Sequence, residues 1–300
     1  MVAARGLAVV AAAGLTAAGC STGSSVVVSA PSGAAGGAQP EPQLAPEVGE
    51  CRGPVDIAII DAAADPRPTT SCEAPHGSET FWVSEMDPRI EAWPGGSDEA
   101  GQLLDQQVTE ECRGRHEQYL GLDPAASPNP PPDRLQIFAF FIPTEADFDA
   151  GARWFRCDAV VEPLTAAEST SIEGTLDGVY TRPLPAAYRL CEARLGTPVS
   201  CDEDHEIEYL ASVALDQLTS FPLQRGDLEV TAACRTPLLE ALGLTEERAD
   251  LTFGYVLPNR EDWDRGAKGA ICVAGAADGS ELTGTLAGLG SSSQLPRAEG

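Results

Sequence analysis

The sequence predicts an α+β protein made of two tandem homologous modules, each with a mainly antiparallel sheet and one or two helices stapled by disulfides. Three observations predict this fold. Eight cysteines fall into two sets of four, four blocks of sequence recur about 110 to 129 residues apart, and each half mixes strand-like with helix-like patterns. The chain has 300 residues, which is enough for two domains of ordinary size.

The first nineteen residues are predicted to be an export signal. Arg5 supplies the positive charge, and residues 6–18 form an apolar stretch that is shorter than a membrane span. The stretch ends in Leu15-Thr16-Ala17-Ala18-Gly19-Cys20, which resembles a bacterial lipobox with Ala17 where leucine is usual. We therefore expect a lipid on Cys20, whose two acyl chains suffice for lasting membrane attachment. Ordinary signal cleavage, or an uncleaved short anchor, is the alternative.

Residues 20–48 are predicted to be a flexible tether. They are rich in Ser, Gly, Ala and Pro and carry almost no charge, so they cannot bury enough apolar area to offset chain entropy. The folded part then divides into a first module at residues 49–181 and a second at residues 182–290. Residues 291–300 are expected to form a flexible tail.

The charge of the chain narrows the range of its partners. It has 46 acidic and 19 basic residues, a net charge of −27. Such a surface repels the phosphate backbone of nucleic acid and anionic lipid head groups, and no basic stripe with interleaved aromatic residues is present. We therefore expect no nucleic-acid partner, and membrane contact through the lipid anchor.

Apart from Cys20, the even number of cysteines in an exported chain predicts a disulfide framework. Keeping the bonds within each module, with one pattern in both, leaves three possible pairings. We favour the pairing of sequence neighbours: Cys51–Cys72, Cys112–Cys157, Cys191–Cys201 and Cys234–Cys272. Zinc binding by thiolates is the rival interpretation, against which stand the oxidising compartment and the lack of a Cys-x-x-Cys pair. We expect no metal and no cofactor.

The repeated blocks predict an internal duplication. They are Ser-Cys-x-x-x-His-x-x-Glu, Cys-Arg before Leu-Gly-Leu, a proline fourteen residues before a cysteine, and Gly-Thr-Leu-x-Gly. They begin at Ser71, Cys112, Pro143 and Gly174 in the first half, and at Ser200, Cys234, Pro258 and Gly284 in the second. Four blocks in one order at domain-sized spacing indicate two copies of one module.

In the first half, residues 79–85 read as a strand. Ser97 is expected to cap a helix whose inner face carries Leu104, Val108 and Cys112 at i, i+4 spacing and which ends at Gly121. A proline-rich loop at 123–133 leads to a strand at 135–142.

A short helical turn should follow in each half, capped by Thr144 or Asn259 and ending at Gly151 or Gly266. A strand carrying Cys157 or Cys272 comes next. Phe148 and Trp263 are expected to anchor this corner in the core. The second half differs at Pro237, which is expected to start or break a helix.

The assembled pattern resembles the actinobacterial septum-formation family of secreted or membrane-anchored modules. The motifs that carry the resemblance are the Gly49-Glu50-Cys51 start, the Cys72…Pro75-His76…Glu79 block, the Pro143…Gly151-x-Arg153…Cys157 block and the Gly174-Thr175-Leu176-x-Gly178 end. The second half repeats them in degenerate form, without the proline before His205. The resemblance implies an envelope location and a link to cell division, and it brings no catalytic residues with it.

Two histidines form the candidate chemical site. His76 with Glu79, and His205 with Glu208, hold equivalent places and could serve acid–base work or a divalent metal. Alternatively each imidazole caps a turn beside its disulfide and bonds the backbone or the glutamate. Strand geometry favours the structural alternative, because residues three apart on a strand point to opposite faces. His116 is interpreted as a surface histidine.

Other chemistry finds little support in the sequence. There is no Gly-x-Ser-x-Gly elbow and no glycine-rich phosphate loop. The acidic run at residues 202–208 lacks the spacing of an EF-hand and is interpreted as a solvated turn.

The favoured hypothesis is a non-catalytic, lipid-anchored binding or scaffold protein at the outer face of the cytoplasmic membrane, with secretion as the alternative location. Its partner would be an envelope protein or a cell-wall polymer. A metal-assisted hydrolase and an envelope sensor domain are the other two hypotheses.

Overall fold

The computed structural model of the protein describes residues 44–96, 98–122, 132–222 and 226–298. The predicted signal peptide, Cys20, most of the predicted tether, Ser97 and most of the predicted proline-rich loop lie outside the described residues. No helix in the described ranges is both long enough and apolar enough to cross a membrane.

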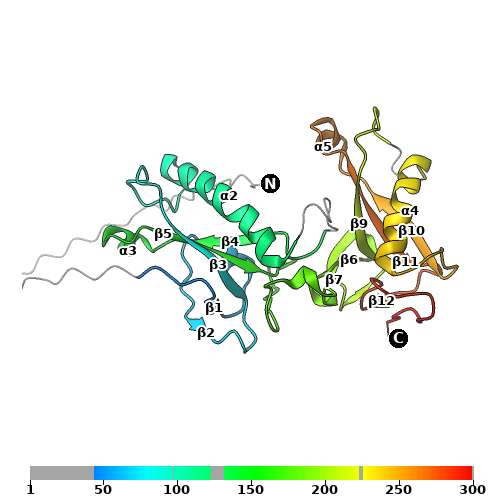
Figure 1. The fold of residues 1–300 in the computed structure, drawn as a ribbon, viewed down its shortest axis with the longest axis horizontal. Helices are drawn as coiled ribbons and strands as arrows, with labels where there is room; N and C mark the ends of the chain where they lie inside the picture. Colours follow the sequence, from blue (N-terminus) through cyan, green and yellow to red (C-terminus); the bar gives the residue numbers. More distant parts are fainter. Residues whose placement is uncertain (1–43, 97, 123–131, 223–225, 299–300) are drawn as a thin grey trace, which may run out of the picture. The chain divides into compact units, whose positions relative to one another are not determined.

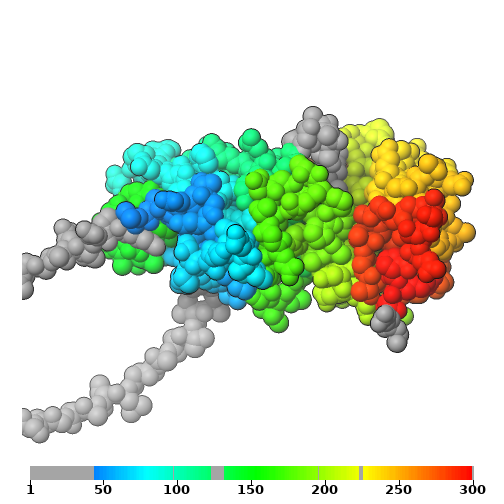
Figure 2. Space-filling model, turned by 60° about the horizontal axis from the view of Figure 1, so that its bottom comes forward, coloured from blue at the N-terminus to red at the C-terminus, as the bar shows by residue number. Residues whose placement is uncertain are grey.

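The first sheet has five antiparallel strands in the order β2-β1-β3-β5-β4 (Figure 1). They are β1 (Cys51–Arg52), β2 (Thr69–Thr70), β3 (Ser78–Glu85), β4 (Phe138–Phe141) and β5 (Trp154–Val160). In Figure 2 the blue surface of the first described residues lies beside the light-blue surface of those that follow, as the pairing of β1 with β2 requires. The strand predicted at residues 79–85 is confirmed as β3, which begins one residue earlier, at Ser78.

The predicted strand at 135–142 is shorter in the structure, because its ends are hydrogen-bonded elsewhere. The Leu135 amide donates to the Asp133 side chain at 2.8 Å, and the Ile142 amide donates to the carbonyl of Ala63 at 2.9 Å. Only the four residues of β4 remain free to pair with β5.

Helix α2 (Glu99–Leu120) packs on one face of this sheet, here called the inner face. Asp98 is its N-cap, where the sequence predicted Ser97, and its side chain accepts a hydrogen bond from the Gly101 amide. Gly121 ends the helix in the left-handed region with φ of 77°, as predicted. The helix is joined to β5 by the Cys112–Cys157 disulfide.

The opposite face of the first sheet, here called the outer face, is covered by the chain between β1 and β2. This segment includes α1 (Ile57–Ile60). Its side chains form a small core with the outer face of the sheet, made of Val55, Ala139, Phe141 and Val160 with Ile59, Ile60 and Ile137 packed against them. The first sheet is therefore a layer with protein on both sides.

The second sheet has the same strand order as the first. Its antiparallel strands run β7-β6-β9-β11-β10, and β8 pairs separately with β12. The bounds are β6 (Leu190–Ala193), β7 (Thr197–Ser200), β8 (Asp204–His205), β9 (Ile207–Ala214), β10 (Leu251–Val256), β11 (Gly269–Ala276) and β12 (Leu282–Thr283).

Helix α4 (Leu228–Leu242) packs on the inner face of the second sheet and is joined to β11 by the Cys234–Cys272 disulfide. The expectation that Pro237 starts or breaks a helix was wrong, since Pro237 lies inside α4. A proline there leaves one backbone carbonyl without its intrahelical donor. The buried side chains of Val230, Leu238 and Leu242 and the disulfide offset that loss.

Two five-residue helices, α3 (Glu145–Asp149) and α5 (Arg260–Asp264), form the predicted turns before β5 and β11. Thr144 and Asn259 cap them as predicted. Phe148 and Trp263 are buried, which confirms them as core residues.

All four disulfides join the sequence neighbours that were favoured, the remaining two being Cys51–Cys72 and Cys191–Cys201. The 3₁₀ helices are η1 (Val179–Thr181), η2 (Ala186–Tyr188) and η3 (Arg194–Gly196). Tyr188 belongs to the core of the first sheet. The described part of the expected tail is packed, with Leu295 buried beside Leu282, so the folded part extends beyond residue 290.

Candidate functional site

His76 and Glu79 meet in a buried network just before and inside β3. The Nδ1 atom of His76 lies 2.8 Å from the carbonyl oxygen of Ala74, and its Nε2 atom lies 2.9 Å from Oε1 of Glu79. The His76 amide also donates to the carbonyl of Ile172 at 3.2 Å. The ring is therefore held at both nitrogens and through its backbone.

Glu79 is the centre of this network. Its Oε2 atom accepts hydrogen bonds from the hydroxyls of Tyr119 at 2.5 Å and Thr175 at 3.0 Å. The Leu176 amide donates to both carboxylate oxygens at 3.1 Å. Both oxygens are thus occupied by donors from α2 and from the Gly-Thr-Leu turn. Burial raises the pKa of Tyr119, and the neighbouring Glu79 carboxylate adds to the rise.

The prediction that His76 and Glu79 point to opposite faces was wrong. It assumed that both residues belong to one strand, but β3 begins at Ser78. The backbone of His76 pairs instead with Ile172 in an isolated bridge. The alternation of side chains therefore does not extend back to residue 76, and the two side chains converge.

The corresponding network in the second half keeps the glutamate and the turn but loses the histidine bond. Glu208 accepts hydrogen bonds from the Thr285 hydroxyl at 2.6 Å and the Leu286 amide at 2.5 Å. The Nδ1 atom of His205 lies 2.8 Å from the carbonyl oxygen of Glu203. Its Nε2 atom is buried and has no hydrogen-bond partner among the described residues.

Arg189 donates to Glu208 in place of Tyr119, and not in place of the histidine. Its Nη1 atom lies 3.2 Å from Oε1 of Glu208, whose side chain is fully buried. In the first half that place is held by Tyr119, seven residues after Cys112, and the residue seven after Cys234 is Ala241. Burial raises the pKa of Glu208, and the Arg189 charge opposes the rise.

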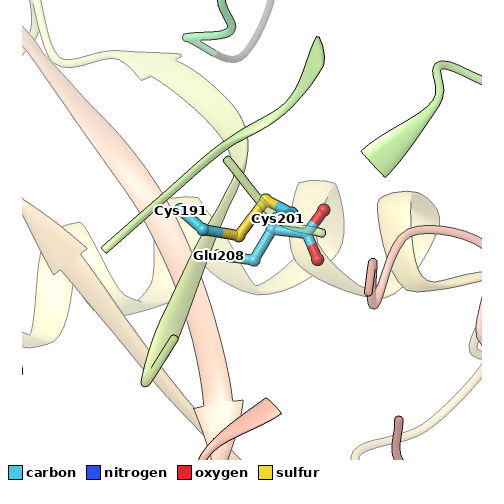
Figure 3. A group of neighbouring side chains, drawn as sticks. All are labelled: Cys191, Cys201 and Glu208. Atoms are coloured by element: carbon cyan, nitrogen blue, oxygen red, sulfur yellow. A yellow bond between two sulfur atoms is a disulfide. The ribbon is translucent and has the colours of Figure 1, made fainter. Parts of the chain in front are cut away.

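The Cys191–Cys201 disulfide lies against Glu208, and Figure 3 shows the carboxylate beside the two sulfur atoms. One ligand atom from each of these three residues lies within 4.8 Å of the others. Zinc sites use cysteine as the thiolate, and here both sulfur atoms are bonded to each other. This grouping is therefore a packed disulfide and does not support the metal-assisted hydrolase.

The acidic run at residues 202–208 is only partly the solvated turn that was predicted. Asp202 and Glu203 are exposed, and both accept hydrogen bonds from Ser200. His205 and Glu208, in contrast, are buried. The run is a turn whose last residues enter the core.

His116 is buried as well, which corrects its interpretation as a surface residue. Its ring packs against those of Phe81 and Phe138, at centroid distances of 5.3 and 5.5 Å. The Nε2 atom has no hydrogen-bond partner among the described residues. Burial lowers the pKa of His116 to about 4. His116 lies four residues after Cys112, at the same spacing that places Leu104 and Val108 on the inner face of the helix. This spacing could have predicted that His116 is buried.

A buried charge cluster on the outer face of the first sheet was not foreseen. Arg156 donates to Asp65 at 2.5 Å and to Asp158 at 3.1 Å. Thr80 donates to Asp158 at 2.8 Å, and Arg52 donates to Thr80 at 3.3 Å. The sequence could have predicted this cluster from Arg156 and Asp158, which flank Cys157. Because side chains alternate along a strand, both must point to the face opposite the disulfide.

The geometry of the two glutamates favours a structural role. Glu79 and Glu208 are 2% and 0% exposed, and their oxygens accept hydrogen bonds from groups of the same fold. A general base needs a free lone pair within reach of a substrate. The two networks hold the turns at Thr175 and Thr285 against the sheets.

The comparison with known proteins gives one result. A model of the family described as "Septum formation" matches residues 60–272, more than two thirds of the chain and parts of both sheets. No curated protein and no solved structure matches the chain. The match agrees with the resemblance carried by the cysteine, histidine and Gly-Thr-Leu motifs, and the chain belongs to the septum formation family.

Proposed function

We propose that the protein is a non-catalytic binding or scaffold protein of the actinobacterial cell envelope that acts in septum formation. In this proposal it consists of two copies of one disulfide-stapled module and is held at the outer face of the cytoplasmic membrane by a lipid on Cys20. The family match supports the link to division and to the envelope.

The likeness of the two sheets supports the duplication. Both have one strand order, and both carry a register shift at the same place. In β3 the shift skips Phe81, two residues after Glu79, and in β9 it skips Leu210, two residues after Glu208. A β-bulge is a specific feature of a strand pair, so its recurrence at matched positions supports descent from one module.

The observation that carries the binding role is the burial of both His/Glu positions, in which the oxygens of both glutamates are hydrogen-bonded within the fold. The residues most capable of acid–base chemistry are buried, and Glu79 and Glu208 have their oxygens bonded within the fold. Four disulfides then fix two sheets and their helices. A rigid framework whose two His/Glu pairs are buried suits a protein that presents surfaces to a partner.

The test of this function is capture of envelope material by the full chain. The lipidated protein, purified in oxidised form, is incubated with solubilised envelope, and retained protein and wall polymer are identified by mass spectrometry. Reduced and alkylated protein is the control, because it lacks the framework. We expect at least one partner enriched about tenfold by the oxidised form. Equal capture by both forms, or no capture, would refute the binding role.

The anchor has its own test. Replacing Cys20 by alanine removes the site of lipidation, so the protein should leave the membrane fraction and enter the medium. Fractionation of cells that produce the C20A chain measures this. An unchanged membrane fraction would refute the lipid anchor while leaving the binding role open to the capture assay.

A further inference from the structure

The outer face of the second sheet is apolar at positions where that of the first sheet is charged. Cys272 is bonded to α4 on the inner face, so its neighbours Ile271 and Val273 point outward. Val256 of the edge strand pairs with Ile271, and Tyr209 pairs with Val273. We call these four residues, together with Ile207, the outer patch.

The first sheet shows how such a face is normally covered. Arg156 and Asp158, on either side of Cys157, hold the places of Ile271 and Val273. They are buried by the segment between β1 and β2, in which Asp65 bonds Arg156 and Ile59 packs near Phe141. Phe141 pairs with Arg156 as Val256 pairs with Ile271. The side chain of Phe141 is 0% exposed, whereas that of Val256 is 36% exposed.

The covering segment has no counterpart in the second half. The first disulfide of the first half spans a sequence separation of 21 and that of the second half a separation of only 10. The chain there passes from β6 through η3 directly into β7. Among the described residues, α4 packs on the inner face, and no helix or strand covers the outer patch. Ile207, Tyr209 and Ile271 are accordingly half-buried, while Val273, which pairs with Tyr209 and Gly254 on the neighbouring strands, is buried.

A sheet face that meets only water normally carries polar side chains at its outward positions. Here the charged pair that lies under a cover in the first sheet is replaced by two apolar residues, of which Ile271 is half-buried and Val273 is buried with 6% exposure. An uncovered apolar patch on a soluble domain marks a place where another molecule binds.

Charge identifies the kind of partner. The five strands of the second sheet contain two glutamates, Glu192 and Glu208, and no lysine or arginine. Glu192 pairs with Ile207 and accepts a hydrogen bond from the Tyr209 hydroxyl at 2.5 Å, so its carboxylate borders the outer patch. A second copy of the chain would bring another Glu192 and another net charge of −27 to the same place. A partner with a basic residue is complementary.

We propose that the outer patch binds a segment of another protein that carries branched aliphatic side chains and a lysine or arginine directed at Glu192. This inference rests on the proposed binding function and names the surface that performs it. The segment covers the second sheet as residues 53–67 cover the first.

A photo-cross-linking residue placed at position 256 of the full chain, in the cells that naturally produce it, tests the proposal. The matched control is position 231, which is exposed on α4 at the other face of the same sheet. We expect a covalent adduct from position 256 and none from position 231. Mass spectrometry of the cross-linked peptide should find a segment of another protein with branched aliphatic residues and at least one lysine or arginine. An adduct with a second copy of the chain, an acidic segment, or equal adducts at both positions would overturn the proposal.

Charge substitutions in the capture assay separate this inference from the proposed function. V256K should reduce capture of the partner by about tenfold or more and V256E by less, because only lysine repels a basic segment. T231K should capture as much as the unchanged chain. If the unchanged chain captures a partner and V256K captures it equally well, the patch proposal fails and the binding function stands. If the unchanged chain captures nothing, both fail.

Discussion

The Nε2 atom of His76 lies 2.9 Å from Oε1 of Glu79, and both side chains are buried. The same glutamate holds Tyr119 of α2 and the amide of Leu176, so one carboxylate joins a strand, a helix and a turn that are far apart in the sequence. Its role can be measured as a contribution to stability.

Replacing Glu79 by glutamine should lower the free energy of unfolding by about 2–4 kcal/mol, because a buried network loses its charged acceptor. Hydrogen exchange at the Leu176 amide should become faster. Urea denaturation and exchange measured by mass spectrometry check the two effects. E110Q, at an exposed position of α2, is the matched control and should change stability by less than about 0.5 kcal/mol. Equal effects of E79Q and E110Q would contradict the network.

His116 should make the fold sensitive to acid. Its pKa is lowered to about 4 by burial, from an ordinary value of 6.5. A histidine with a depressed pKa contributes full stability above pH 6.5 and loses it as the pH falls through 4. Substitution by leucine, the residue at the matched position 238, removes this loss.

The free energy of unfolding of the unchanged chain, relative to that of H116L, should therefore fall by roughly 3 kcal/mol between pH 7 and pH 4. Denaturation curves of both chains at the two pH values give this difference. A difference that does not vary with pH would show that His116 is not buried in its neutral form.

Asp133 should make the fold less stable as the pH rises, which is the opposite of the effect of His116. Burial raises the pKa of Asp133 to about 6, while hydrogen bonds from Tyr180 and the Leu135 amide oppose the rise. A carboxyl with a raised pKa contributes full stability below its unfolded value of 3.8 and loses it as the pH rises through 6.

D133N keeps a neutral side chain at every pH. Its stability relative to the unchanged chain should therefore rise by roughly 2 kcal/mol from pH 4 to pH 7. Thermal or urea unfolding at both values measures the change. If the stability of D133N relative to the unchanged chain were the same at both pH values, burial would not raise the pKa of Asp133.

Pro237 should weaken α4. Alanine at this position restores the backbone donor for the carbonyl four residues earlier and has the highest helix propensity. We expect P237A to raise the free energy of unfolding by about 1–3 kcal/mol, as measured by urea denaturation. A loss of stability would show that the proline ring contributes packing that alanine cannot replace.

Local patterns in the sequence were enough to predict much of the fold. The i, i+4 spacing that ends at Cys112, the glycine at position 121 and the caps at Thr144 and Asn259 are short-range signals, and the structure confirms each of them. The disulfide pairing followed from proximity in sequence and the demand for one pattern in both halves.

The candidate site depended on contacts that the sequence does not reveal. The residues that bind Glu79 and Glu208 include Leu176, Arg189 and Leu286, and long-range folding alone brings them to the carboxylates. The error over His76 came from extending β3 two residues too far. Pro237 was misjudged because tertiary packing overrides local propensity.

The most direct test of the central claim is capture of the envelope partner by a chain in which His76 and His205 are both replaced by glutamine. If the two histidines serve the fold and the protein acts by binding, the doubly substituted chain should capture the partner within about twofold of the unchanged chain, at a temperature where circular dichroism shows both folded. A tenfold loss of capture by a chain with unchanged circular dichroism would contradict the account, because the histidines would then take part in the function itself.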